Sequence, residues 1–146
     1  MNICERILDG KNLDPKHIQM RSPIALAYVG DTIFDLYLRT HLVTSTDLPP
    51  KELHQHASQY ANAAAQAAMI KNIEHMLTEE EYSVFRRGRN AKSYTVPKHA
   101  KLIDYRLATG FESLLGYIYL SGNEDRLVEL MRAAVSSLGE EMTTHE

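Results

Sequence analysis

The stretch "ALAYVGDTIFDLYLR" (residues 25–39) has the apolar content of a buried helix, yet it carries a glycine and two aspartates near its middle. Gly30 costs a helix interior about 1 kcal/mol relative to alanine, and Asp31 is a poor helix former. Asp31 and Asp35 are four residues apart and therefore share one face of the helix. They are either two solvated surface acids or part of a functional site.

The helical periodicity extends over most of the chain, and no convincing strand interrupts it. We predict helices over residues 22–43, 50–77, 78–89, 102–120 and 123–139. The first follows an N-capping serine and a proline, and the third begins with a capping box. The expected fold class is therefore all-α.

The chain has the composition of one globular domain. Its 146 residues are 44% hydrophobic and 24% charged, which allows a real core but no second full-sized domain. We expect a core over residues 22–138, a lead-in over 1–21 and a polar tail over 139–146. The sequence has no signal-peptide pattern and no apolar run long enough for a membrane span. Cys4 is the only cysteine, so we expect a reducing, cytoplasmic compartment and no membrane association.

A third acid stands in the stretch "FESLLGYIYL" (residues 111–120), where Glu112 is the only charge between Arg106 and Glu124. An unpaired carboxylate buried in such an apolar helix would be costly, so Glu112 lies at the helix edge or has a partner. Asp31 and Glu112, on two core-like helices, could converge on one metal ion, although helical spacing alone cannot establish this.

The chain has a net charge of −3, but one segment is strongly basic. The run "RRGRNAKSYTVPKHAK" (residues 86–101) contains no acid. Its candidate RNA-binding residues are Arg86, Arg87, Arg89, Lys92, Lys98 and Lys101. Such a concentrated patch favours phosphate contacts, and its single aromatic residue favours a duplex over a single strand. The alternative is a solvated loop that binds nothing.

Other catalytic chemistries have no support in the sequence. His54 and His56 lie on different faces of a helix, and no HExxH or CxxC motif accompanies them. Nucleophile-elbow, P-loop and GxGxxG motifs are also missing.

These stretches resemble a known family. "ALAYVGDTIFDLYLR" is similar to the signature helix of ribonuclease III endonuclease domains, and "FESLLGYIYL" resembles their second acidic helix. "RRGRNAKS" between them resembles the Mini-ribonuclease III branch, which has no double-stranded RNA-binding domain. The resemblance covers residues 22–138 and implies an all-α homodimeric endonuclease domain. It also implies dependence on Mg²⁺, cleavage of double-stranded RNA and maturation of bacterial 23S ribosomal RNA, with ribosomal proteins on the precursor as possible partners.

The resemblance implies that Asp31 and Glu112 are catalytic residues and metal ligands. Larger ribonucleases III carry two further carboxylates, at the positions of Ala27 and Thr109 here, which the Mini branch also lacks. Asp35 has no counterpart in the catalytic set, so we expect it to have a supporting or dimer-contact role.

We also predict a homodimer, because the helix from Ser22 to Val43 is apolar on more than one face. Phe34 and Tyr37 are its expected support or dimer residues. The alternatives are a non-catalytic RNA-binding or ribosome-associated adaptor and a pure protein-interaction module.

Overall fold

The computed structural model describes residues 1–11, 13–92 and 101–138. Within these ranges the protein is built from helices and contains no strand, which confirms the all-α prediction. The helices are α1 (Ile3–Ile7), α2 (Pro15–Gln19), α3 (Pro23–Ser45), α4 (Pro50–Ala61), α5 (Ala63–Ile73), a 3₁₀ turn η1 (Glu74–Met76), α6 (Glu79–Asn90), α7 (Leu102–Leu120) and α8 (Glu124–Ser136). None of the helices described is both long and apolar enough to cross a membrane.

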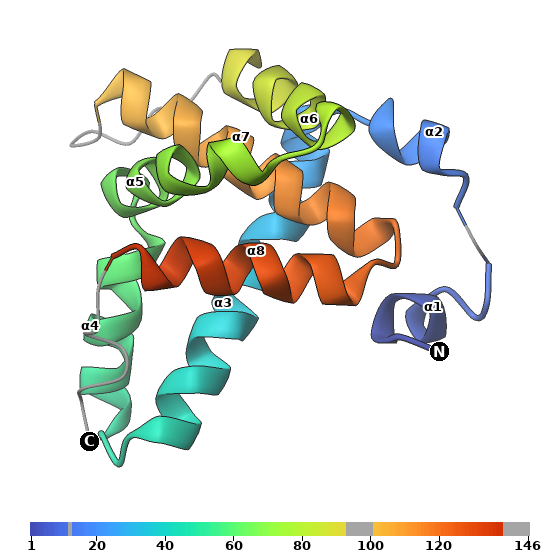
Figure 1. Cartoon of the computed structure of the whole chain (residues 1–146). Coiled ribbons are helices and arrows are strands. Elements are labelled where there is room, and N and C mark those ends of the chain that lie inside the picture. Colours follow the sequence, from blue (N-terminus) through green and yellow to red (C-terminus); the bar gives the residue numbers. More distant parts are fainter. Residues whose placement is uncertain (12, 93–100, 139–146) are drawn as a thin grey trace.

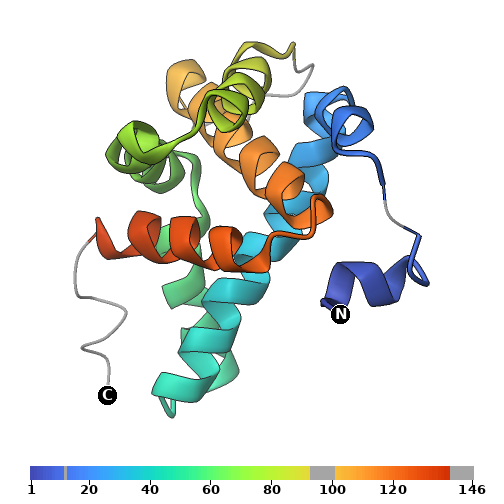
Figure 2. The same ribbon diagram turned by 45° about the vertical axis from the view of Figure 1, so that its right-hand side comes forward.

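Helix α7 is the centre of the molecule. It packs against α2, α3, α5, α6 and α8, and Figures 1 and 2 show it lying among these helices. A helix that is apolar around most of its circumference requires cover on several sides. The buried side chains of Phe111, Leu114 and Leu115 provide this apolar surface. Glu112, between them in sequence, is therefore placed on a core helix.

Two glycines allow α3 and α7 to cross in direct backbone contact. A Cβ atom added to Gly30 would lie 1.8 Å from the carbonyl oxygen of Glu112. One added to Gly116 would lie 2.0 Å from the carbonyl oxygen of Leu26. No side chain fits at either position, so the contact between α3 and α7 explains the costly Gly30 in the signature stretch.

The predicted single helix over residues 50–77 is wrong, because the structure divides it. Asn62 has an extended backbone between α4 and α5, with ψ of 162°. Its side-chain oxygen accepts a hydrogen bond from Ala65 N, while its amide donates to the carbonyls of Ser58 and Gln59. Asparagine is a favoured N-cap, so one residue closes α4 and starts α5 within the alanine-rich run.

The prediction of the later helix boundaries is largely confirmed. The capping box of Thr78 and Glu81 begins α6, and Asn123 caps α8. Helix α7 has the predicted bounds. Helix α6 continues one residue beyond Arg89, and α8 ends at Ser136, while Gly139 lies outside the described residues.

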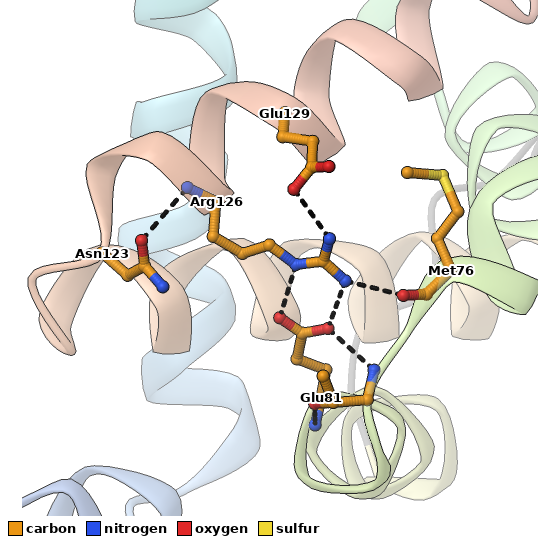
Figure 3. Close-up of polar contacts among 6 residues, drawn as sticks. Met76, Glu81, Asn123, Arg126 and Glu129 are labelled. Carbon is orange, nitrogen blue, oxygen red and sulfur yellow. Dashed lines mark hydrogen bonds and ion pairs between the residues drawn. The ribbon is translucent and has the colours of Figure 1, made fainter.

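An ion-pair cluster joins α6 to α8. The Arg126 guanidinium donates to both carboxylate oxygens of Glu81 at 2.8 and 2.9 Å and to the Met76 carbonyl at 2.6 Å. It also pairs with Glu129 at 2.8 Å, as Figure 3 shows. Burial alone would raise the pKa of Glu81, but hydrogen bonds from Arg126 and Thr78 hold it below its ordinary value. The cluster fixes the relative positions of α6 and α8.

The lead-in contains two short helices, α1 and α2. Each has only 5 residues, too few for a periodic apolar pattern to predict them. Asn2 and Ile3 attach α1 to the turn between α7 and α8, through hydrogen bonds to the Gly122 carbonyl and the Glu124 side chain at 2.9 and 3.0 Å. The N-terminal segment is therefore anchored to the body of the domain.

Candidate functional site

The crossing of α3 and α7 brings Asp31 and Glu112 together. Gly30, the neighbour of Asp31, touches the backbone of Glu112 itself, so the two acids extend from the same point of contact. Asp31 is exposed and Glu112 is half-buried. The structure thus joins the two candidate metal ligands that lie on separate helices.

The pKa of Glu112 reports this proximity. It is raised to about 9, chiefly by burial and further by the hydrogen bond and charge repulsion from Asp31. Asp35 contributes a smaller repulsion, whereas Gln66 acts in the opposite direction. Two carboxyl groups this close do not both ionise near neutral pH without a compensating positive charge.

The donor set of the site fits a hard divalent cation. Among the residues that the structure describes, no group of three or more His, Cys, Asp or Glu side chains is arranged to hold a metal. Mg²⁺ is usually held by one or two carboxylates together with water and substrate phosphates. Asp31 and Glu112 supply two adjacent oxygen donors, which suffices for that kind of site.

The positions of the missing family carboxylates are buried. Ala27 and Thr109 are each 8% exposed. The Thr109 hydroxyl donates to the Tyr105 carbonyl at 3.0 Å and is therefore engaged within its own helix. Neither residue supplies a charge to the acidic pair.

The three expected support residues differ in position. Asp35 is half-buried, and its charge contributes to the raised pKa of Glu112. Its Oδ2 atom lies 3.9 Å from the Nη2 atom of Arg39. Phe34 is 1% exposed and meets Phe111 edge-on, with ring centroids 5.5 Å apart. It is a core residue of the protomer and not a surface contact. Tyr37 is half-buried against His41, with ring centroids 4.6 Å apart.

The basic candidates do not form one uniform patch. Arg87 donates to the backbone carbonyls of Gln19 and Arg21, the latter at 3.4 Å, and so joins α6 to α2. The Arg89 guanidinium lies over the Phe85 ring, 5.5 Å from its centroid.

Of the other four basic candidates, three are exposed: Arg86, Lys92 and Lys101. The fourth, Lys98, lies outside the described residues. A phosphate could therefore reach the three exposed side chains directly.

The sequence reasoning missed Gln66. It lies in the first turn of α5, is 3% exposed, and lowers the pKa of the Glu112 carboxyl group. Its Nε2 atom is buried and has no hydrogen-bond partner within the described part of the chain. The available signal was one amide side chain inside the run "AAAQAAM" (residues 63–69), where a purely packing surface needs none.

Comparison with a solved structure agrees with this architecture. A protein from Fusobacterium nucleatum, known from its crystal structure, matches with a TM-score of 0.73 and 24% identity. The match covers 82% of this chain and 95% of that one. It establishes the similarity of the fold.

Sequence comparison identifies the family. The Ribonuclease III domain family matches residues 24–123. Mini-ribonuclease 3 of Clostridium tetani is 38% identical over 138 residues, which cover 94% of this chain and 91% of the relative. Mini-ribonuclease 3 of Enterococcus faecalis is 46% identical over 119 residues, which cover 80% and 90% of the two chains. This chain therefore belongs to the ribonuclease III family of endoribonucleases, within its Mini-ribonuclease III branch.

Proposed function

We propose that this protein hydrolyses phosphodiester bonds in double-stranded RNA, with Asp31 and Glu112 as catalytic residues and Mg²⁺ as the cofactor. The observation that carries the proposal is the pairing of these two carboxyl groups across the glycine contact of α3 and α7. Acids placed side by side at a cost to stability are typical of functional sites.

Asp31, on α3, and Glu112, on α7, would together hold the cation. When bound, Mg²⁺ supplies positive charge beside the scissile phosphate and lowers the pKa of water. Asp31 is exposed, so an RNA phosphate can approach its carboxylate from solvent. Glu112 is half-buried and fixed to a core helix, which limits the positions that its carboxylate can adopt.

Recognition of the duplex would depend on shape and backbone charge. An A-form helix presents its minor groove and phosphates, and its bases are poorly accessible to side chains. The exposed Arg86, Lys92 and Lys101 support phosphate contacts, and we include Arg89 and Lys98 in the same proposal. Arg87 is assigned mainly to the α2 contact.

The name shared by the relatives and the duplex chemistry suggest a biological substrate. We propose that the protein matures the precursor of 23S ribosomal RNA, and that ribosomal proteins on that precursor are partners. Cleavage of both strands calls for two sites, so the proposed assembly is a homodimer. The outer surface of α3 supports this, because Tyr28 is 81% exposed and Leu36 is 57% exposed.

The test is cleavage of a long RNA duplex by the purified protein in Mg²⁺. Asp31→Asn keeps the size of the side chain and removes its charge, so the rate should fall on the order of 10²- to 10³-fold. Glu112→Gln should fall similarly and recover in part at higher Mg²⁺.

The control is Asp47→Asn, which removes the same charge at an exposed position. It should cleave like the wild type. If Asp31→Asn cleaves at the wild-type rate, the proposed metal site is wrong; if the wild type binds duplex without cutting it, the protein is an adaptor.

A further inference from the structure

Gln66 is a buried polar residue that has no role in the proposed mechanism. Its side chain is almost fully buried, although it lies on an alanine-rich helix whose neighbouring positions require only small apolar residues. A buried amide N–H without a partner is unfavourable, and such groups in native proteins usually have a specific reason. The residues around the Gln66 amide explain why a polar group is buried at this position.

Gln66 lies beside Glu112, one of the two acids of the site. Helix α5 packs against α7, which carries Glu112. The Gln66 amide is near enough to stabilise the ionised Glu112 carboxylate. Its Nε2 atom, a donor, nevertheless has no hydrogen-bond partner of normal geometry among the described residues. The amide therefore lies within range of the Glu112 carboxylate, whose pKa it lowers, without a well-formed hydrogen bond to it.

We infer that Gln66 is a positioning residue, which donates a hydrogen bond from Nε2 to the Glu112 carboxylate when that carboxylate holds a divalent cation. One carboxylate oxygen then faces the cation while the other accepts from the amide. Partners behind a ligand orient it, and their loss typically lowers metal affinity or activity 10- to 100-fold. This inference rests on the metal site proposed above.

An amide suits this position better than a charged residue. A lysine would add a positive charge that competes with the cation, and a third acid would add to the repulsion between Asp31 and Glu112. Glutamine supplies a donor without a net charge. With Ala27 and Thr109 in place of the additional carboxylates, the site has few charged ligands, so the orientation of each has more weight.

The test replaces Gln66 by leucine, which has a similar volume and no polar atom. Three quantities are measured: Mn²⁺ affinity without RNA, by electron paramagnetic resonance; kcat and KM on an RNA duplex; and the melting temperature without metal. Gln66→Leu should weaken Mn²⁺ binding about tenfold and lower kcat about tenfold, with KM unchanged. The metal-free melting temperature should stay equal or rise, because the variant buries no unpartnered amide.

The matched control is Gln55→Leu, the same change at an exposed position of α4. It should leave all three quantities unchanged. Gln66→Met, which keeps a long flexible side chain, replaces Gln66→Leu if the leucine variant does not fold. A lower melting temperature with normal Mn²⁺ affinity and normal kcat would show that Gln66 is only structural and overturn the inference.

The proposed function can fail separately. Wild-type cleavage by Asp31→Asn would reject the metal site, whatever Gln66→Leu does. Loss of cleavage in Asp31→Asn together with normal metal binding and kcat in Gln66→Leu would reject only the role of Gln66.

Discussion

Glu81 and Glu112 are both withdrawn from solvent, yet their pKa values move in opposite directions. Glu81 faces the Arg126 guanidinium, and its pKa is held below the ordinary value. Glu112 faces another acid, and burial together with that acid raises its pKa to about 9. A carboxylate that is paired with a cationic side chain stabilises the fold. A carboxylate beside a second acid has no such counter-ion in the protein, which favours the cation site proposed for Asp31 and Glu112.

The Glu81 pair should make stability depend on pH. Glu81→Gln keeps the capping hydrogen bonds of α6 but removes the charge, so we expect a loss of about 2 kcal/mol in the free energy of unfolding near pH 7. Because the folded pKa is lowered, this contribution is present above the ordinary value of 4.5 and is lost as the pH falls through the folded pKa. Urea unfolding of both proteins from about pH 3 to about pH 7, which spans the ordinary pKa of a carboxyl group, measures the difference.

Glu129 provides the control for that experiment. It pairs with the same guanidinium at 2.8 Å, but its side chain is 56% exposed. Glu129→Gln should cost less than about 1 kcal/mol. Equal losses in the two variants would show that burial of the Glu81 pair contributes nothing.

At the scale of elements, the contact between α3 and α7 determines the geometry of the site. Gly30→Ala adds a methyl group where the Glu112 carbonyl lies, so the helices must separate. The gain in helix propensity offsets only part of that strain, and we expect a net loss of about 2 kcal/mol in the free energy of unfolding. Cleavage should fall more than unfolding explains, because Asp31 moves away from Glu112.

Thermal melts and cleavage rates measured well below the melting temperature test this expectation. Thr32→Ala, at an exposed position of the same helix, is the control and should change neither quantity greatly. A Gly30→Ala variant with normal stability would show that the two helices adjust without cost.

The basic segment should act through charge and not through base recognition. Replacing Arg86, Arg89 and Lys92 together by glutamine should weaken duplex binding for all sequences alike. The slope of log affinity against log salt should flatten by up to about 3, since each phosphate contact releases counter-ions. Binding isotherms at several salt concentrations give the slope.

Lys51, Lys71 and Arg132 allow a charge-matched comparison. All three are exposed and lie on α4, α5 and α8. Their joint replacement by glutamine changes the net charge equally and should reduce the slope less. The same slope in both triple variants would place the duplex away from α6.

At the scale of the whole molecule, the proposed dimer should be separable from the fold. Leu36 is exposed on α3, so Leu36→Lys should yield a folded monomer, whereas Phe34→Lys should unfold the protomer. Sedimentation velocity gives the oligomeric state and circular dichroism gives the fold. A Leu36→Lys protein that remains dimeric would exclude this face as the interface.

Mixed dimers test cleavage of both strands. A wild-type protomer paired with an Asp31→Asn protomer should nick one strand of a duplex and fail to cut both. A monomer that makes double-strand cuts in one encounter would rule out the proposed arrangement.

The sequence by itself determined most helix boundaries and the family. Caps and turns depend on residues a few positions apart, so the N-cap residues Ser22, Thr78 and Asn123 predict where their helices begin. The signature around Gly30 and Asp31, with Glu112, was likewise readable as a local motif. The same local signals are ambiguous in the alanine run, where the cap at Asn62 is not evident from the sequence.

The tertiary structure decided what each polar side chain faces. Arg87 is part of a basic run in sequence, but its carbonyl partners lie near residue 20. Gln66 lies in an alanine-rich run in sequence but stands beside Glu112 in space. Such partners come from other helices, and their positions follow from how closely the helices approach. The periodicity of one helix shows which face is buried, whereas the close packing of backbone at Gly30 and Gly116 determines what that face meets.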